Sequence, residues 1–118
     1  MEGYSEKGGS TMSGNAFLFT KRRLTDDHYL AIALREARDM KKPPITMTNF
    51  WKHAENYDDV EKPLHDLLAW LDREAEIGDF VVLEGDERLV KAIAKHAKAH
   101  RLIPVRAIWE PEAAIRDL

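Results

Sequence analysis

Residues 78–89, Gly-Asp-Phe-Val-Val-Leu-Glu-Gly-Asp-Glu-Arg-Leu, constrain the fold of this chain more than any other stretch. The apolar run 80–83 is too short and too rich in β-branched residues for a buried helix, and it is typical of a strand covered on both faces. Gly85 permits a sharp turn, and Asp86 can cap a helix over about 87–100. In α/β sheets, ligands bind at such a corner. The simpler interpretation is that the corner is only a turn and a cap.

The rest of the chain alternates between strand and helix signals. We predict further strands and helices, in chain order, at 16–20 (strand), 25 to about 40 (helix), 45–48 (strand), 63 to 78 (helix), 102–109 (strand) and 112 to about 117 (helix). Residues 49–59 show no regular pattern. An alternating order implies a parallel sheet with helices on both faces. The sequence therefore predicts an α/β protein, a small Rossmann-like parallel sheet of about four strands flanked by helices.

The length of 118 residues suits a single domain. Residues 1–15 are rich in Gly and Ser and have no apolar period, so we expect a flexible tail there, or a segment that precedes an alternative start at Met12. The domain would then span residues 16–118. Four strands make a narrow sheet with open edges, and the chain has more large aromatic side chains than the core pattern absorbs. We therefore expect a homodimer.

Composition excludes several classes of function. The net charge of −3 gives no general attraction to duplex nucleic acid or to an anionic membrane, so an anionic ligand would need a local basic patch. The chain has no cysteine, which excludes disulfides and thiolate catalysis. No apolar stretch approaches the roughly 20 residues that span a bilayer, and the N-terminus lacks the apolar core of a signal peptide. We expect a cytoplasmic protein.

Three segments, 20–23, 48–51 and 85–88, each follow a predicted strand and would meet at the carboxyl edge of the sheet. They combine cations, hydroxyls, an amide, an indole and two helix N-termini, which suits phosphates, ribose hydroxyls and a base. Trp51 has two interpretations, a stacking platform for a base or a packing residue. The candidate residues are Thr20, Lys21, Arg22, Arg23, Thr48, Asn49, Trp51, Gly85, Asp86, Glu87 and Arg88.

No standard catalytic motif is present: the chain lacks a dinucleotide-binding glycine fingerprint, a Walker loop, a nucleophile elbow and a zinc-protease motif. His96 and His100 are four residues apart on a predicted helix, but the sequence offers no recognisable third ligand, so we predict neither a metal site nor a cofactor. His28, near the expected site, could touch a ligand. The functions that remain are ligand binding, or catalysis that only positions the substrate and stabilises its charge.

Six parts of the chain together form a recognisable pattern: 17–20 (FLFT), 24–25 (LT), Trp51, 67–71 (LLAWL), 78–86 (GDFVVLEGD) and 102–105 (LIPV). In these segments the chain resembles a small family of accessory proteins encoded beside type III CRISPR systems, which are similar to the CARF domains (CRISPR-associated Rossmann folds) that sense cyclic oligoadenylates. In this chain, one more residue than is usual in the family precedes Leu24, Lys21 stands where the family often has histidine, and Glu87 follows the Gly-Asp corner.

This resemblance implies a homodimer that binds cyclic tetra-adenylate across its two-fold axis and, as a ring nuclease, cuts it without a metal. The ribose 2′-OH would attack the neighbouring phosphate and leave a linear product with a 2′,3′-cyclic phosphate. Lys21, Arg22 and Arg23 would stabilise the developing charge, and the N–H groups of the helix beginning near Glu87 would hold a phosphate. Asp86 would orient a ribose hydroxyl, act as a base or only cap. The alternatives are a sponge that sequesters the ligand uncut, and a protein-interaction module.

Overall fold

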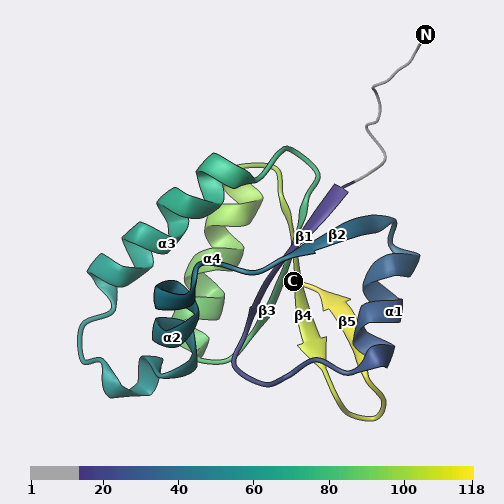
Figure 1. Ribbon diagram of the computed structural model, residues 1–118, viewed down its shortest axis with the longest axis horizontal. Helices are drawn as coiled ribbons and strands as arrows, with labels where there is room; N and C mark the ends of the chain where they lie inside the picture. Colours follow the sequence, from purple (N-terminus) through teal and green to yellow (C-terminus); the bar gives the residue numbers. More distant parts are fainter. Residues whose placement is uncertain (1–13) are drawn as a thin grey trace, which may run out of the picture.

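A computed structural model describes residues 14–118 and confirms the α/β class (Figure 1). This part of the chain forms one sheet in the order β2-β1-β3-β4-β5. The first four of these strands are parallel, and the last is antiparallel to its neighbour. The strands are β1 (Gly14–Thr20), β2 (Ala37–Lys41), β3 (Phe80–Glu84), β4 (Ile103–Ile108) and β5 (Ala114–Asp117). The helices are α1 (Asp26–Leu34), α2 (Ile45–Lys52), the short 3-10 helix η2 (Ala54–Asn56), α3 (Glu61–Glu74) and α4 (Glu87–Ala99).

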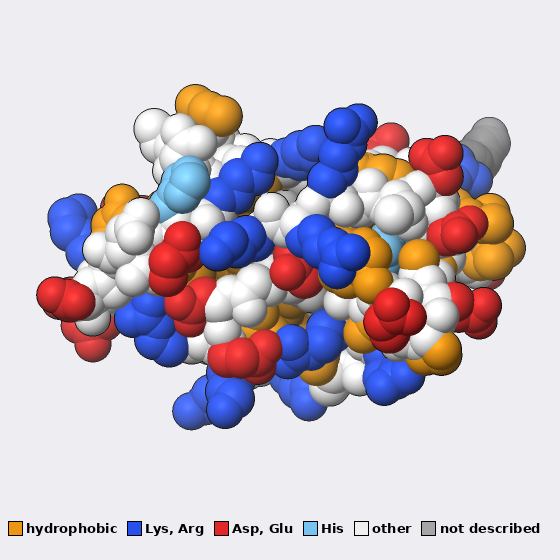
Figure 2. Space-filling model, turned by 90° about the horizontal axis from the view of Figure 1, so that it is seen from below, with side chains coloured by type: hydrophobic (Ala, Val, Ile, Leu, Met, Phe, Trp, Pro, Cys, Tyr) orange, Lys and Arg blue, Asp and Glu red, His pale blue; other side chains and the backbone are white. Residues whose placement is uncertain are grey.

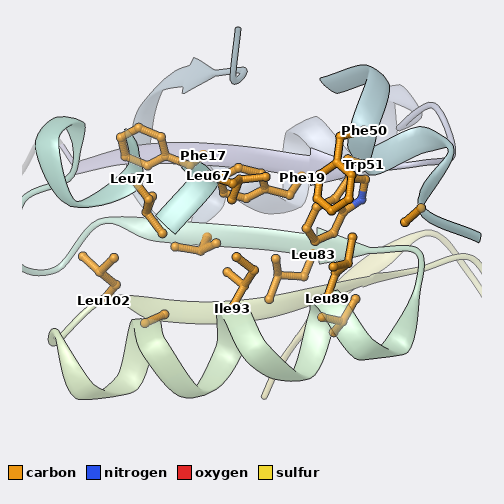
Figure 3. Close-up of a cluster of buried hydrophobic side chains, with 14 residues drawn as sticks. Phe17, Phe19, Phe50, Trp51, Leu67, Leu71, Leu83, Leu89, Ile93 and Leu102 are labelled. Carbon is orange, nitrogen blue, oxygen red and sulfur yellow. The ribbon is translucent and has the colours of Figure 1, made fainter. Parts of the chain in front are cut away.

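The helices form two layers, one on each face of the sheet. Helices α2, α3 and α4 cover one face, and α1 packs on the other (Figure 1). Alternate residues of β1 face the two layers: Phe17 and Phe19 join the larger core, and Ala16 and Leu18 join the smaller one. Figure 3 shows the larger core between the sheet and its helices. Among residues 14–118, no helix combines the length and the apolar character that crossing a membrane requires.

The order of connections creates a topological switch point between β1 and β3. The chain leaves β1 through α1 on one face to reach β2, and it returns through α2 and α3 on the opposite face to reach β3. Neighbouring connections therefore diverge at the carboxyl ends of β1 and β3, where Thr20 pairs with Glu84. Ligands of open α/β sheets bind at such a point.

The structure confirms the strand, turn and helix predicted for residues 78–89. Strand β3 is buried over 80–83, and an Asp86 Oδ1 accepts a hydrogen bond of 2.9 Å from the Arg88 backbone N–H as the cap of α4. Gly85 has a φ of +140°, and a Cβ there would stand 3.0 Å from Nε1 of Trp51. The corner requires glycine because of both its backbone angle and the indole beside it.

The helix predicted from 25 to about 40 is wrong beyond α1. The chain turns at Glu36, whose φ is +69°, and residues 37–41 form the edge strand β2. The local sequence favours helix, but hydrogen bonds to β1 outweigh this weak preference. An edge strand also needs no continuous apolar run, so its pattern did not indicate a strand.

The strand predicted at 45–48 is wrong as well, because these residues open α2, which extends to Lys52 and so enters the segment 49–59 expected to be irregular. Pro44 stands at its N-cap position, where a proline is compatible with a helix start. Phe50 and Trp51 are buried against the larger core. Burial of these two aromatic side chains favours a helix over residues 45–52.

The helix predicted at 112–117 is wrong, since residues 114–117 form β5, antiparallel to β4. This strand raises the sheet from the expected four strands to five among the described residues, and Ile115 packs on the smaller core.

At the N-terminal end of the described residues, Gly14 and Asn15 belong to β1 rather than to a tail. The Asn15 N–H donates to Oδ1 of buried Asp79 at 3.0 Å. The remainder of the predicted tail, residues 1–13, lies outside the described residues.

Candidate functional site

A pocket of about 530 Å³ opens at the carboxyl edge of β1 and β2, between the start of α1 and the body of α2. It lies beside the switch point. Figure 2 looks onto this end of the molecule and shows Lys and Arg side chains gathered across the middle of the face. The residues that line the pocket are Leu18, Thr20, Lys21, Arg22, Arg23, Leu24, Thr25, Asp26, Tyr29, Lys42, Thr48 and Lys52.

The pocket lining is strongly basic. Five lining side chains are cations, and Asp26 is the single carboxylate among them. The cations come from three elements: the loop after β1, the residue after β2, and α2. A chain with a net charge of −3 thus carries the local basic patch that an anionic ligand requires. Three threonine hydroxyls and the Tyr29 side chain add neutral hydrogen-bonding groups.

The cations differ in how they are held. Lys21 Nζ lies 3.0 Å from Oε1 of Glu55, and the Arg22 guanidinium lies 4.3 Å from the centre of the Trp109 ring. A backbone hydrogen bond, with the contact from Lys21, holds the pKa of the exposed Glu55 carboxyl below its usual value. The other three cations, Arg23, Lys42 and Lys52, form no ion pair with any residue in 14–118. Within the described part of the chain, a ligand could therefore reach these three cations without breaking an ion pair.

Glu84 fixes the loop that carries the three consecutive cations. Its Oε1 accepts hydrogen bonds from the backbone N–H groups of Lys21, at 2.9 Å, and Arg22, at 2.6 Å. Its backbone oxygen accepts from Lys21 N, at 3.1 Å, and from Nε1 of Trp51, at 2.9 Å. One residue at the end of β3 therefore joins the β1 loop to α2. Hydrogen bonds to a charged acceptor are stronger than those between neutral groups, so Glu84 holds the backbone of this loop firmly at the end of β3.

His28 anchors the start of α1 beneath the pocket. It is fully buried, and its Nδ1 accepts from the Thr25 backbone N–H at 3.0 Å. The other ring nitrogen must then carry the proton, and Nε2 donates to the Ile108 backbone oxygen at 2.6 Å. The prediction that His28 touches a ligand is therefore wrong, because both ring nitrogens are occupied and the side chain is inaccessible.

The predicted site residues fall into two groups. Thr20, Lys21, Arg22, Arg23 and Thr48 line the pocket. The others lie outside its lining: Asn49, Trp51, Gly85, Asp86, Glu87 and Arg88. Trp51 is 1% exposed and its ring centre lies 5.5 Å from that of Phe19, so the packing interpretation of this side chain is the one observed.

Asp86 and Arg88 form a clamp at the start of α4. Nε and Nη2 of Arg88 donate to the two oxygens of Asp86 at 3.1 and 2.9 Å, and Nη2 also donates to the Ala54 carbonyl at 2.9 Å. The hydrogen bonds from Arg88 lower the pKa of the Asp86 carboxyl. The same hydrogen bonds raise the pKa of the Arg88 guanidinium. Beside them, Arg106 lies 2.6 Å from Oε2 of Glu87 and lowers the pKa of that carboxyl. These side chains hold α4 to its neighbours.

Lys42, Lys52 and Tyr29 complete the pocket, and sequence reasoning did not select them. Lys42 lies just beyond the helix predicted to end at about residue 40, and Lys52 lies in the segment 49–59 that shows no regular pattern. Recognition of β2 would have placed Lys42 at the carboxyl end of a strand, where site residues are expected. The pocket lining includes a single carboxylate and no histidine, which suits an anion rather than a metal ion.

The chain was compared with known proteins. A family model matches residues 15–114, from β1 to the first residue of β5. The chain belongs to the Uncharacterized protein MJ1673 family. The match covers the whole pocket lining, so the basic pocket lies within the part that defines membership of the MJ1673 family. No curated protein and no solved structure matches the chain.

Proposed function

We propose that this pocket binds the phosphates of cyclic oligoadenylate, specifically cyclic tetra-adenylate, and that the protein is a cytoplasmic ring nuclease that switches off type III CRISPR signalling. The observation that carries the proposal is the set of five cations around one pocket of about 530 Å³ beside the switch point. Several cations from separate elements suit a ligand with several phosphates. The resemblance described above supplies the identity of that ligand.

The proposed cleavage requires no metal or cofactor. The ribose 2′-oxygen forms a bond to the adjacent phosphorus while the bond from phosphorus to the 5′-oxygen breaks. The proton of the 2′-hydroxyl passes to water, and the leaving 5′-oxygen takes a proton from water, so the products are a 2′,3′-cyclic phosphate and a 5′-hydroxyl. The cations would stabilise charge on the phosphate oxygens, and Thr20 and Thr48 would orient the ribose.

A homodimer is part of the proposal. A ring of four nucleotides is larger than the ligands that one pocket of this size encloses, so two copies would share it. Helix α1 supports this arrangement, because Leu30 and Leu34 are 58% and 74% exposed and lie one turn apart beside pocket-lining Tyr29. Exposed apolar side chains at this spacing suit an interface between helices.

The second candidate is a sponge that binds the same ligand without cutting it. Asp26 is the only carboxylate in the lining, no lining residue is a histidine, and Asp86 is engaged by Arg88. A general base must lie within hydrogen-bond reach of the proton that it removes. The pocket therefore favours binding over proton transfer, and the same residues would serve the sponge.

Incubation with cyclic tetra-adenylate in EDTA, followed by chromatography, separates the candidates. Linear products ending in a 2′,3′-cyclic phosphate would support the ring nuclease. Ligand recovered intact only after denaturation would support the sponge. Absence of both binding and cleavage would exclude both, and would leave the protein-interaction module.

Single substitutions locate the site. Replacement of Arg23, Lys42 or Lys52 by Ala should weaken binding about 10- to 100-fold, the range expected for one hydrogen bond to a charged group. Lys91→Ala, on the exposed surface of α4 and outside the pocket, is the matched control and should bind normally. Equal affinities for all four variants would show that the ligand binds elsewhere.

A further inference from the structure

Asp72, His96 and His100 converge between α3 and α4, far from the basic pocket. Helix α4 begins at the carboxyl edge of the sheet and returns towards the amino edge, so its last two turns lie at the opposite end of the molecule from the pocket lining. One ligand atom from each of the three side chains lies within 4.8 Å of the other two. None of these residues contributes to the proposed function.

We propose that these three side chains form a binding site for a divalent transition metal ion, with Zn²⁺ as the reference ion. Two imidazoles and one carboxylate are a donor set that zinc uses with a water molecule in the fourth position. His96 and His100 are four residues apart, a spacing that is common on helices and does not by itself indicate a metal site. The sequence shows no recognisable third ligand near them. The packing of α3 against α4 supplies Asp72, whose Oδ1 lies 2.7 Å from Nε2 of His96.

His100 is held in the form that binds metals. Its Nδ1 lies 2.9 Å from the backbone carbonyl oxygen of His96. A carbonyl oxygen only accepts, so Nδ1 carries the ring proton and Nε2 presents a lone pair. Metal-binding histidines commonly donate their second nitrogen to such an acceptor, which fixes both the ring orientation and the tautomer. The two imidazole rings stack with their centres 4.0 Å apart, so the two histidines lie side by side.

His96 and Asp72 would change partners when the metal binds. In the present geometry the N–H of His96 donates to the carboxylate at 2.7 Å. The metal ion would accept lone pairs from Nε2 of His96 and from the Asp72 carboxylate. His96 would change tautomer, because the proton of Nε2 leaves to solvent while Nδ1 takes one up, so the ring stays a neutral ligand. The His96 and Asp72 side chains are 20% and 42% exposed, so an ion can reach them from water. The bound ion would join α3 to α4 at a point where both helices cover the same face of the sheet.

The experiment measures the thermal stability of the full chain with EDTA and then with ZnCl₂. At a free Zn²⁺ concentration about 100 times Kd, an ion that binds only the folded state should raise Tm by roughly 5–15 °C. Co²⁺ should give the visible absorption bands of a tetrahedral site, and Mg²⁺ should have no effect because it prefers oxygen ligands.

Variants identify the ligands. His100→Gln removes one ligand from an exposed position and should abolish the Zn²⁺-dependent rise in Tm, and Asp72→Asn should reduce it. His53→Gln changes an exposed histidine outside the cluster and should retain the full rise. The proposal is overturned if Zn²⁺ leaves Tm of the wild-type chain unchanged, or if His100→Gln keeps the rise. It is equally overturned if His53→Gln loses the rise to the same extent.

Discussion

Glu84 shows how one carboxylate can support a cationic site without belonging to it. Its charge opposes binding of an anion at the nearby pocket, yet its side chain accepts hydrogen bonds from two backbone N–H groups of the cation loop. Electrostatics alone therefore predicts tighter ligand binding when this residue is removed. Positioning predicts the opposite, since the loop loses the acceptor that orders it.

We expect positioning to dominate at Glu84. Glu84→Ala should weaken binding of cyclic tetra-adenylate about 10-fold, since each charge-assisted hydrogen bond contributes on the order of 1.5–3 kcal/mol and the removed charge offsets part of that loss. Glu84→Gln keeps an acceptor oxygen and should bind with intermediate affinity. Titration calorimetry gives both dissociation constants. Tighter binding by Glu84→Ala would show that the order of the loop does not limit affinity.

Glu36 occupies a left-handed backbone conformation just after α1, with a φ of +69° and an exposed side chain. Glycine adopts this conformation without a steric penalty from Cβ, and it is the usual residue at the end of a helix. Glu36→Gly should therefore raise the free energy of unfolding by about 0.5–1 kcal/mol. Urea denaturation measures the change.

Asp39→Gly is the control for this prediction, because Asp39 is exposed in β2 and has no positive φ. Glycine there should lower stability, since it adds freedom to the unfolded chain and gains nothing in the strand. A loss of stability in both variants would show that the turn at residue 36 imposes no strain.

At the scale of the element, the start of α4 links stability to pH. The pKa of Asp86 is lower in the folded chain than its usual value, chiefly because Arg88 donates hydrogen bonds to it. The ionised carboxylate thus favours the folded state above the unfolded pKa, and this contribution disappears as pH falls through the folded pKa. Glu87 acts in the same direction through Arg106.

We therefore expect the free energy of unfolding to fall between about pH 5 and pH 2, and to fall less in Asp86→Asn. Asparagine still caps a helix but has no charge to titrate. Chemical denaturation across this range, with Glu61→Gln as a control at the first turn of α3, measures the difference. Parallel curves for the wild type and Asp86→Asn would assign the acid sensitivity to other carboxyls.

The elements themselves differ in how well their local sequences define them. Strands β1 and β3 are short apolar runs buried on both faces, and α3 has a regular apolar stripe, so each could be predicted from its own residues. The edge strands β2 and β5 could not, because they have mixed polar sequences whose local preference is for helix. Their backbone hydrogen bonds come from neighbours that are distant in sequence, or from a hairpin that forms on the sheet.

At the scale of the whole molecule, α1 leaves an apolar surface open to solvent. Leu34→Lys should place a charge in the proposed homodimer interface and shift sedimentation to the monomer, with at least a tenfold weaker dimer. Ile77→Lys is the matched control, since Ile77 is similarly exposed at 73% but lies in the turn before β3. A monomeric wild-type protein at micromolar concentration would contradict both the dimer and the shared ligand site.

The sequence by itself determined the α/β class, the buried central strands and the corner at Gly85 and Asp86, because these depend on apolar runs and on backbone preferences within a few residues. It also placed three consecutive cations after β1. Only the tertiary structure decided which residues share a site. Sheet order and helix packing brought Lys42 and Lys52 to the pocket and Asp72 to the two histidines, while Trp51 was buried and Asp86 was paired with Arg88. Such neighbours arise from contacts between distant segments, which no local pattern encodes.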